Sequence, residues 1–291
     1  ARDKLLRNDW NETLKHPVFT DVSVKSGIVY DGYSHSVLVN DFNSDGWLDI
    51  YVCNDYVSND ILYMNNRDGT FTNRIGDSFK HFSYSAMGSD VADVNNDGRE
   101  DFFVTEMLPV ENKRKKLFLN ANNYTTYVLT AQYKYEYQYV RNTLQLNMGN
   151  RPDNGMPQFG DVSFYAGTQE TEWSWSTLMA DYDNDGNRDI LITNGFPRDI
   201  TDHDFGAFRS GAGSNLVSKQ QLYNMIPEVR VRNFMFKNNG DLTFRDVSAE
   251  WGINIPTFSN GAAYADFDLD GDLDYVVNNI DDWVHLYRNN L

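Results

Sequence analysis

A nine-residue acidic pattern that recurs four times in one register constrains this chain more than any other feature. Its first copy spans residues 41–49 (DFNSDGWLD), and the later copies begin at Asp93, Asp181 and Asp266. In every copy, side chains with oxygen atoms stand at positions 1, 3, 5 and 9, glycine stands at position 6, and a hydrophobic run follows the last Asp. Recurrence of this kind predicts one array of similar units.

The pattern suits a calcium ion. Ca²⁺ binds six to eight oxygens, and a short turn can supply them from alternating positions. Positions 1, 3, 5 and 9 would give side-chain oxygens, position 7 a backbone carbonyl, and the glycine would allow the positive φ of a sharp turn. We therefore predict up to four Ca²⁺ sites and no other cofactor. Their ligands are Asp41, Asn43, Asp45, Trp47 and Asp49; Asp93, Asn95, Asp97, Arg99 and Asp101; Asp181, Asp183, Asp185, Asn187 and Asp189; and Asp266, Asp268, Asp270, Asp272 and Asp274.

Two other interpretations fit the loops less well. An EF-hand normally has Glu at position 12, where these loops have Val or Ile. Plain Asp-Gly turns would explain one copy, but four copies in one register argue against them. The third and fourth loops carry four carboxylates, whereas the first two have an Asn in place of one. Ligand charge therefore predicts tighter calcium binding by the third and fourth loops.

Short strands are expected on both sides of each loop. Residues 37–39 lead into the first loop, and residues 50–52 leave it as a continuous apolar run, which is typical of a strand covered on both faces. A strand that ends in Asn recurs five times; its first copy is residues 4–8 and its last is residues 285–289. The Phe-containing strand that follows should pair with it as a hairpin. Each repeat is then a four-stranded antiparallel unit whose acidic loop joins the two middle strands.

Face-to-face stacking of such units predicts an all-β fold, a β-propeller of four-stranded blades. We treat residues 1–291 as a single propeller segment with repeats at about residues 9–66, 67–148, 149–238 and 239–291. The wider spacing of the later loops places insertions at about residues 106–141 and 196–232. Within the second insertion, residues 218–226 are expected to form a short helix that ends at Pro227. Four full repeats and a leading strand at residues 4–8 favour part of a larger propeller over a closed four-bladed ring.

Composition limits the classes of partner. The net charge of −17, without a basic stripe, argues against nucleic acid. The chain has no apolar run of about 18 residues, so no membrane span is expected. Its single Cys53 excludes an internal disulfide framework and leaves the redox compartment open. The chain does not begin with Met, which is typical of a processed or trimmed piece.

The D-x-[DN]-x-D-G-x-x-D loops resemble those of the FG-GAP/VCBS repeat family, which includes the blades of integrin α-chains. Residues 107–109, 141–147 and 194–201 resemble the long VCBS-repeat surface proteins of Bacteroidetes-type bacteria. The resemblance implies a calcium-stabilised propeller, commonly of seven blades, on a secreted or surface-anchored protein. The resemblance also implies that the side chains at all sixteen positions, which are positions 1, 3, 5 and 9 of the four loops, are calcium ligands. The Phe-Gly and Gly-Ala-Pro tripeptides of the family name are not recognisable, so the resemblance supports the architecture rather than integrin-like ligand binding.

The predicted function is a binding or scaffold module, extracellular, at the outer-membrane surface or in the periplasm. Its partner would be a glycan or a surface protein, and further blades or domains of a longer protein are expected. Trp173, Trp175 and the Tyr run at residues 133–139 are candidate sugar platforms, although their period of two also fits packing in a core. An assembly role beside an outer-membrane transporter or adhesin is a further alternative.

The opposing hypothesis is a polysaccharide lyase or hydrolase on a calcium-binding propeller. Such an enzyme needs a general base and an acid that converge in a cleft. Residues 198–204, which include His203, are the only dense cluster with His, Arg and carboxylates. Ion pairing or helix capping explains this cluster equally well, so no catalytic residue is assigned.

Overall fold

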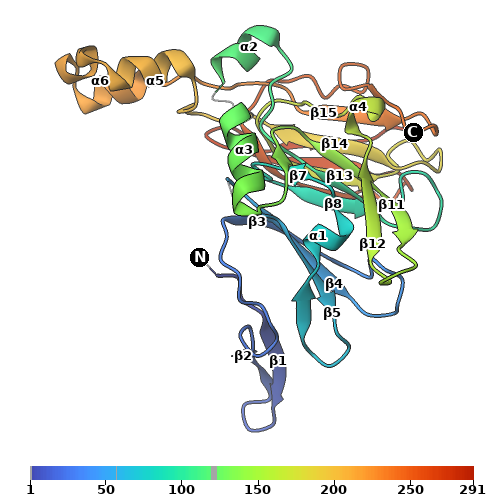
Figure 1. Cartoon of the computed structure of the whole chain (residues 1–291). Helices are drawn as coiled ribbons and strands as arrows, with labels where there is room; N and C mark the ends of the chain where they lie inside the picture. Colours follow the sequence, from blue (N-terminus) through green and yellow to red (C-terminus); the bar gives the residue numbers. More distant parts are fainter. Residues whose placement is uncertain (1, 57, 119–122) are drawn as a thin grey trace.

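Antiparallel β-sheets form most of the structure (Figure 1). It is a computed structural model that describes residues 2–56, 58–118 and 123–291. Within these ranges, three sheets of four strands are followed by one of three, and we number these sheets along the chain. The first contains β3 (Ser34–Asn40), β4 (Asp49–Asn54), β5 (Ile61–Asn65) and β6 (Phe71–Asn73), and the second contains β8 (Ser89–Ala92), β9 (Asp101–Val104), β11 (Thr143–Asn150) and β12 (Pro157–Asp161). The third contains β13 (Ser174–Ala180), β14 (Asp189–Asn194), β15 (Phe234–Asn238) and β16 (Phe244–Asp246), and the fourth contains β17 (Ser259–Ala265), β18 (Asp274–Asn279) and β19 (His285–Tyr287).

The predicted four-stranded antiparallel unit is confirmed, but the predicted position of its acidic loop is wrong. The strand order in the first sheet is β3-β4-β5-β6, so the loop at residues 41–49 joins an edge strand to its neighbour, not the two middle strands. The cause is β6, which the repeat pattern assigns to the next unit. It pairs with β5 through a tight turn in which Asn66 N–H donates to Thr70 C=O. Each four-stranded sheet therefore takes its last strand from the following sequence repeat.

The sheets stack face to face, as the apolar second strands predict. In β4, β9 and β14 nearly every residue is buried. Aromatic side chains fill the space between the first two sheets, where the Phe42 and Phe102 ring centroids lie 4.5 Å apart. Similar apolar clusters join the second sheet to the third and the third to the fourth. The first strands also contact one another in order, β3 with β8, β8 with β13, and β13 with β17.

Both ends of the stack keep apolar side chains exposed. Val37 of β3 is exposed on the first sheet, and Leu286 of β19 is exposed on the fourth. Strands β1 (Leu6–Asn11) and β2 (His16–Asp21) form the predicted N-terminal hairpin, which projects from the stack (Figure 1) and exposes Phe19. In the part of the chain that the structure describes, the sheets form an open stack rather than a closed ring. The blade number stays a prediction.

Both predicted insertions contain helices. The first contains α2 (Asn112–Leu117) and α3 (Tyr124–Tyr133), and its residues 119–122 lie outside the described ranges. The second contains α5 (His203–Ser210), a 3-10 helix (Ala212–Leu216) and α6 (Lys219–Asn224), and α5 and α6 protrude from the stack (Figure 1). Helix α6 confirms the helix predicted before Pro227, and Ser218 caps it in a reciprocal arrangement with Gln221. The remaining short elements are α1 (Ile75–Ser78), α4 (Ser163–Ala166) and a parallel pair of β7 (Phe82–Ser83) and β10 (Gln138–Tyr139).

The carboxyl groups of Asp60 and Glu106 are fully buried, away from the acidic loops. Asp60 accepts hydrogen bonds from the Tyr51 hydroxyl and the Asn54 N–H, and Glu106 accepts from the Ser85 and Met107 N–H groups. Burial removes water from the charged form and outweighs these donors. It raises the pKa of Asp60 to about 7 and the pKa of Glu106 to about 8.

The metal-free protein should therefore lose stability as the pH rises from about 4 to about 8. In this window the folded state keeps protons on Glu106 and Asp60 that the unfolded state has already released, so deprotonation favours unfolding. Glu106→Gln should flatten the decline between pH 6 and 8, because the amide carries no charge to desolvate. Urea unfolding in EDTA at several pH values measures the slope, with Glu12→Gln on the exposed surface as the control. A slope unchanged by Glu106→Gln would contradict this assignment.

Candidate metal centres in the repeated loops

All four acidic loops share one backbone conformation. The glycine at position 6 has a positive φ in each loop, between +84° at Gly98 and +99° at Gly271, so the predicted need for glycine is confirmed. The residue at position 4 also has a positive φ, a backbone conformation that residues other than Gly, Asn and Asp seldom adopt. These residues are Ser44, Asn96, Asn184 and Leu269, with φ between 56° and 62°.

The aspartate at position 1 holds each loop closed. In the first loop, Asp41 Oδ1 accepts from the Asp45 N–H at 2.9 Å and Asp41 Oδ2 accepts from the Gly46 N–H at 2.7 Å. The other loops repeat both bonds, and in every loop the position 5 carboxylate accepts from the N–H of position 7. Because the hydrogen bonds are the same, the first and fifth side chains are oriented alike in the four loops.

Oxygens at position 3 give the best test of whether a cation fits. Asn43 Oδ1 and Asp183 Oδ1 are buried and accept no hydrogen bond from the described protein groups. Such an oxygen is costly to bury, and a hard cation would satisfy it. The all-oxygen donor sets therefore fit Ca²⁺. Oxygens of Asp181, Asp183 and Asp185 in the third loop lie within 4.8 Å of one another, as do oxygens of Asp266, Asp268 and Asp274 in the fourth.

The aspartate at position 9 has a structural role that sequence reasoning missed. Asp189 is fully buried, and it accepts from the Tyr182 N–H at 3.1 Å and from the Asn238 N–H at 2.9 Å, which ties the loop to the end of β15. The ninth residues of the other loops make the same two bonds. Burial raises the pKa of Asp189 to about 7 and the pKa of Asp49 and Asp101 to about 6. Each carboxylate oxygen keeps a second lone pair for a metal.

Side chains at position 7 share no common role. Trp47 is exposed, and Arg99 forms an ion pair with Asp97. The amide of Asn187 donates to its own loop, whereas Asp272 is buried. This variety is compatible with the prediction that position 7 contributes its backbone carbonyl.

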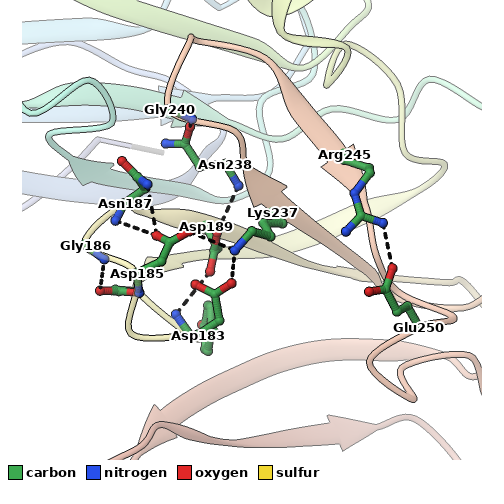
Figure 2. Close-up of polar contacts among 12 residues, drawn as sticks. Asp183, Asp185, Gly186, Asn187, Asp189, Lys237, Asn238, Gly240, Arg245 and Glu250 are labelled. Carbon is green, nitrogen blue, oxygen red and sulfur yellow. Dashed lines mark hydrogen bonds and ion pairs between the residues drawn. The ribbon is translucent and has the colours of Figure 1, made fainter. Parts of the chain in front are cut away.

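Each loop pairs with a basic side chain, a second feature that sequence reasoning missed. Figure 2 shows Lys237 reaching from β15 to two carboxylates of the third loop. These contacts neutralise part of the negative charge of the loop. The pairs are Arg67 with Asp45, Arg99 with Asp97, Lys237 with Asp183 and Asp185, and Arg288 with Asp268 and Asp270.

Asparagines at the strand ends connect successive loops. The Asn147 amide donates to the Phe42 C=O in the preceding loop at 3.2 Å, and Asn238 donates to the Val94 C=O at 2.8 Å. Asn289 makes the equivalent bond to the loop of the third sheet. The sequence does show that Asn ends all five copies of this strand. It does not show the hydrogen-bond acceptor of each Asn, because that acceptor lies in another repeat.

The candidate catalytic cluster at residues 198–204 is held by structural contacts. Arg198 forms an ion pair with Glu228, and Asp202 caps α5 by accepting from the Phe205 N–H. Asp199 is buried in the ion-pair cluster described below. Ion pairing and helix capping, the structural explanations of this cluster, therefore account for these three side chains.

The candidate sugar-binding aromatics separate into two groups. Trp173 is buried, and its ring stacks on Phe196 with centroids 4.3 Å apart, which makes it part of the packing. Trp175 donates its Nε1–H to the Gly195 C=O. In contrast, Tyr133 and most of the other tyrosines beside α3 remain at the surface.

Arg114 joins the two insertions. Its guanidinium contacts the fully buried Asp199, and its Nε lies 3.5 Å from Glu172 Oε2. Burial raises the pKa of Glu172, although Arg114 opposes the shift. The arginine therefore compensates two carboxylates that lie away from water.

Arg114→Met should destabilise the fold by about 2–3 kcal/mol, because it leaves two buried carboxylates without a counter-ion. Denaturant unfolding measures the loss. Lys113→Met, which changes an exposed residue of the same helix, should alter stability by less than about 0.5 kcal/mol. Equal losses in the two variants would contradict a structural role for the Arg114 ion pairs.

Comparison with protein families finds one known repeat. No curated protein matches the chain at a significant level. One family model matches a single segment of the chain, residues 41–104. This segment begins at the first Asp of the first loop and ends with β9, so it contains two loops and the strands between them. The narrower resemblance to VCBS-repeat surface proteins stays a prediction. Residues 41–104 match the family model of the FG-GAP-like repeat, so this segment of the chain is similar to that repeat.

Proposed function

We propose that this chain is a calcium-stabilised binding module that works outside the cytoplasm and holds a glycan at a cell surface. FG-GAP repeats are generally adhesion or binding modules, which gives the functional class. The observation that carries the calcium proposal is the conformation shared by four loops, with buried position 3 oxygens that lack a donor in the first and third. Outside the cytoplasm, millimolar calcium would fill even weak loops of this kind.

Calcium would act as a structural ion in these loops. When bound, it would neutralise the carboxylates and fix the turn between the first two strands of each sheet. The residues that would hold it in the third loop are Asp181, Asp183, Asp185 and Asp189, with the carbonyl of Asn187. Asp189 ties that loop to β15 and would keep the donors in place. A structural role agrees with the position of the loops at an edge of each sheet, away from both insertions.

Tyrosines of the first insertion supply the surface that best fits a glycan. The Tyr127 and Tyr137 rings are stacked, with centroids 5.3 Å apart and planes at 22°. Aromatic faces stack on sugar rings, while hydroxyl and amide groups bind sugar hydroxyls. A groove of about 290 Å³ beside α3 carries both kinds of group and no charged side chain among its described lining residues, which are Asn123, Tyr124, Thr126, Tyr127, Thr130, Tyr137, Gln138 and Tyr139.

Retention of the calcium-loaded protein on immobilised neutral and acidic polysaccharides tests this proposal. Tyr127→Ala should weaken retention at least about tenfold on the glycan that binds, because the residue forms half of the stacked pair. Tyr165→Ala, an exposed tyrosine on α4, is the matched control and should bind as the unaltered chain does. No retention, or equal retention of both variants, would contradict a glycan site in this groove. Release of unsaturated sugar ends would instead identify a lyase.

We also propose that the stacked sheets are blades of a larger propeller of about seven. The support is the exposed apolar surface at both ends of the stack, including Val37 and Leu286. Further blades of the same kind would cover these side chains.

A further inference from the structure

The basic partners of the third and fourth loops occupy the same place in the repeat. Lys237 and Arg288 each directly precede the strand-end Asn, whose N–H donates to the ninth Asp of the loop. The equivalent residues in the first and second sheets are Met64 and Leu146, which precede Asn65 and Asn147 and are apolar. Among the four sheets with an acidic loop, a basic residue therefore stands at this position in the third and fourth, whose loops have four carboxylates at the ligand positions.

Lys237 has the better-defined contacts of the two basic residues. Its Nζ lies 2.8 Å from Asp185 Oδ2 and also contacts Asp183 Oδ2, while its side chain is 25% exposed. Both aspartates are predicted ligands of the third loop, and Asp183 Oδ1 is the buried oxygen that lacks a donor. In Figure 2 dashed lines join the ammonium group to both carboxylates. The lysine on β15 thus compensates part of the negative charge of the third loop.

We propose that Lys237 is a tethered counter-ion that holds the third loop folded without metal and competes with calcium for Asp183 and Asp185. The inference rests on the proposed calcium function and concerns how tightly one loop binds the ion. Two carboxylates in contact with an ammonium group must give up those bonds before they can coordinate calcium fully. Nearby positive charge also opposes a divalent cation. The extra carboxylate of the third loop is thereby offset, so a count of carboxylates alone overstates its affinity.

Opposite effects with and without calcium distinguish this role from ordinary packing. In EDTA, Lys237→Met should lower the Tm by about 3–6 °C, because Asp183 and Asp185 lose their counter-ion. In saturating calcium the deficit should disappear or reverse, and the affinity of the third loop should rise about tenfold. Met is compatible with the fold, since Met64 already stands at the equivalent position of the first sheet. Thermal melts and calcium titration by calorimetry measure both quantities.

Two variants control the comparison. Arg245 pairs with Lys237 across β15 and β16, but its guanidinium bonds to Glu250 and not to the loop (Figure 2). Arg245→Met makes the same change of charge and should alter the calcium response by less than about 1 °C. Lys237→Arg keeps the charge and should retain the melting behaviour of the unaltered chain in EDTA.

The outcomes separate the two proposals. If the unaltered chain responds to calcium and Lys237→Met responds equally, the counter-ion inference fails and the calcium function stands. If calcium changes neither the Tm nor the calorimetric heat of the unaltered chain, the calcium function fails and the inference fails with it. A larger calcium response in Lys237→Met than in Arg245→Met supports both.

Discussion

Removal of calcium with EDTA should lower the Tm of this protein by at least about 10 °C relative to the protein in calcium at about 100 times its Kd. A ligand that binds only the native state contributes about 2.7 kcal/mol per site when its concentration is 100 times Kd. For a domain of 150–250 residues, 1 kcal/mol corresponds to roughly 2–4 °C. Two or more filled loops therefore give a shift of this size. Their contributions add because each ion binds a separate loop, between the first two strands of a different sheet.

Differential scanning calorimetry in EDTA, in calcium and in magnesium tests the expected shift. Magnesium is the informative control because it demands a smaller octahedral site and keeps its water, so its effect should be smaller. Readdition of calcium to the chelated protein should restore the higher Tm. Equal Tm values in EDTA and calcium would contradict a stabilising ion in the loops.

Asp189→Ala is expected to cost about 3–5 kcal/mol of folding free energy even in EDTA. The carboxylate accepts from the buried N–H groups of Tyr182 and Asn238, and each donor left without a partner costs about 1–3 kcal/mol. The substitution also removes the hydrogen bond between the Asn238 N–H at the end of β15 and the loop. Denaturant unfolding of the metal-free variant measures the loss.

Asp183→Ala separates this structural role from metal binding. Asp183 is a predicted ligand whose Oδ1 accepts no hydrogen bond from the described groups and whose Oδ2 contacts Lys237. Its removal in EDTA should cost about 1 kcal/mol, because Lys237 keeps its ion pair with Asp185. In calcium the same variant should lose most of the stabilisation from the third loop. If Asp183→Ala were as damaging as Asp189→Ala in EDTA, the distinct roles of positions 3 and 9 would be wrong.

The local features of this fold could be predicted from the sequence because each depends on neighbouring residues. The glycine turns, the buried second strands and the helix capped by Ser218 follow from short patterns and are confirmed. The strand order could not be predicted in the same way. The hairpin between β5 and β6 is predicted and confirmed, but the expected repeat bounds separate its two strands between residues 66 and 67, so the wrong strand is placed at the edge of the sheet.

In the candidate site, too, the local features could be predicted and the contacts between distant residues could not. Loop spacing identifies the oxygen donors, but it does not show that Asp189 is bonded to β15 or that Lys237 reaches Asp183. Both contacts join residues about 50 positions apart in sequence. The predicted ranking of loop affinities by carboxylate count stays a prediction, and the ion pairs of Lys237 and Arg288 with their loops are charge interactions that such a count leaves out.

Calorimetric titration of calcium into chelator-treated protein tests the central claim most directly. The predicted result is saturable binding of two to four ions per chain with Kd values at or below about 1 mM, within the range of extracellular calcium modules. Asp181→Ala should remove one of these ions and leave the others. The absence of saturable binding up to about 10 mM calcium, well above that range, would contradict the claim that these repeated loops are calcium sites.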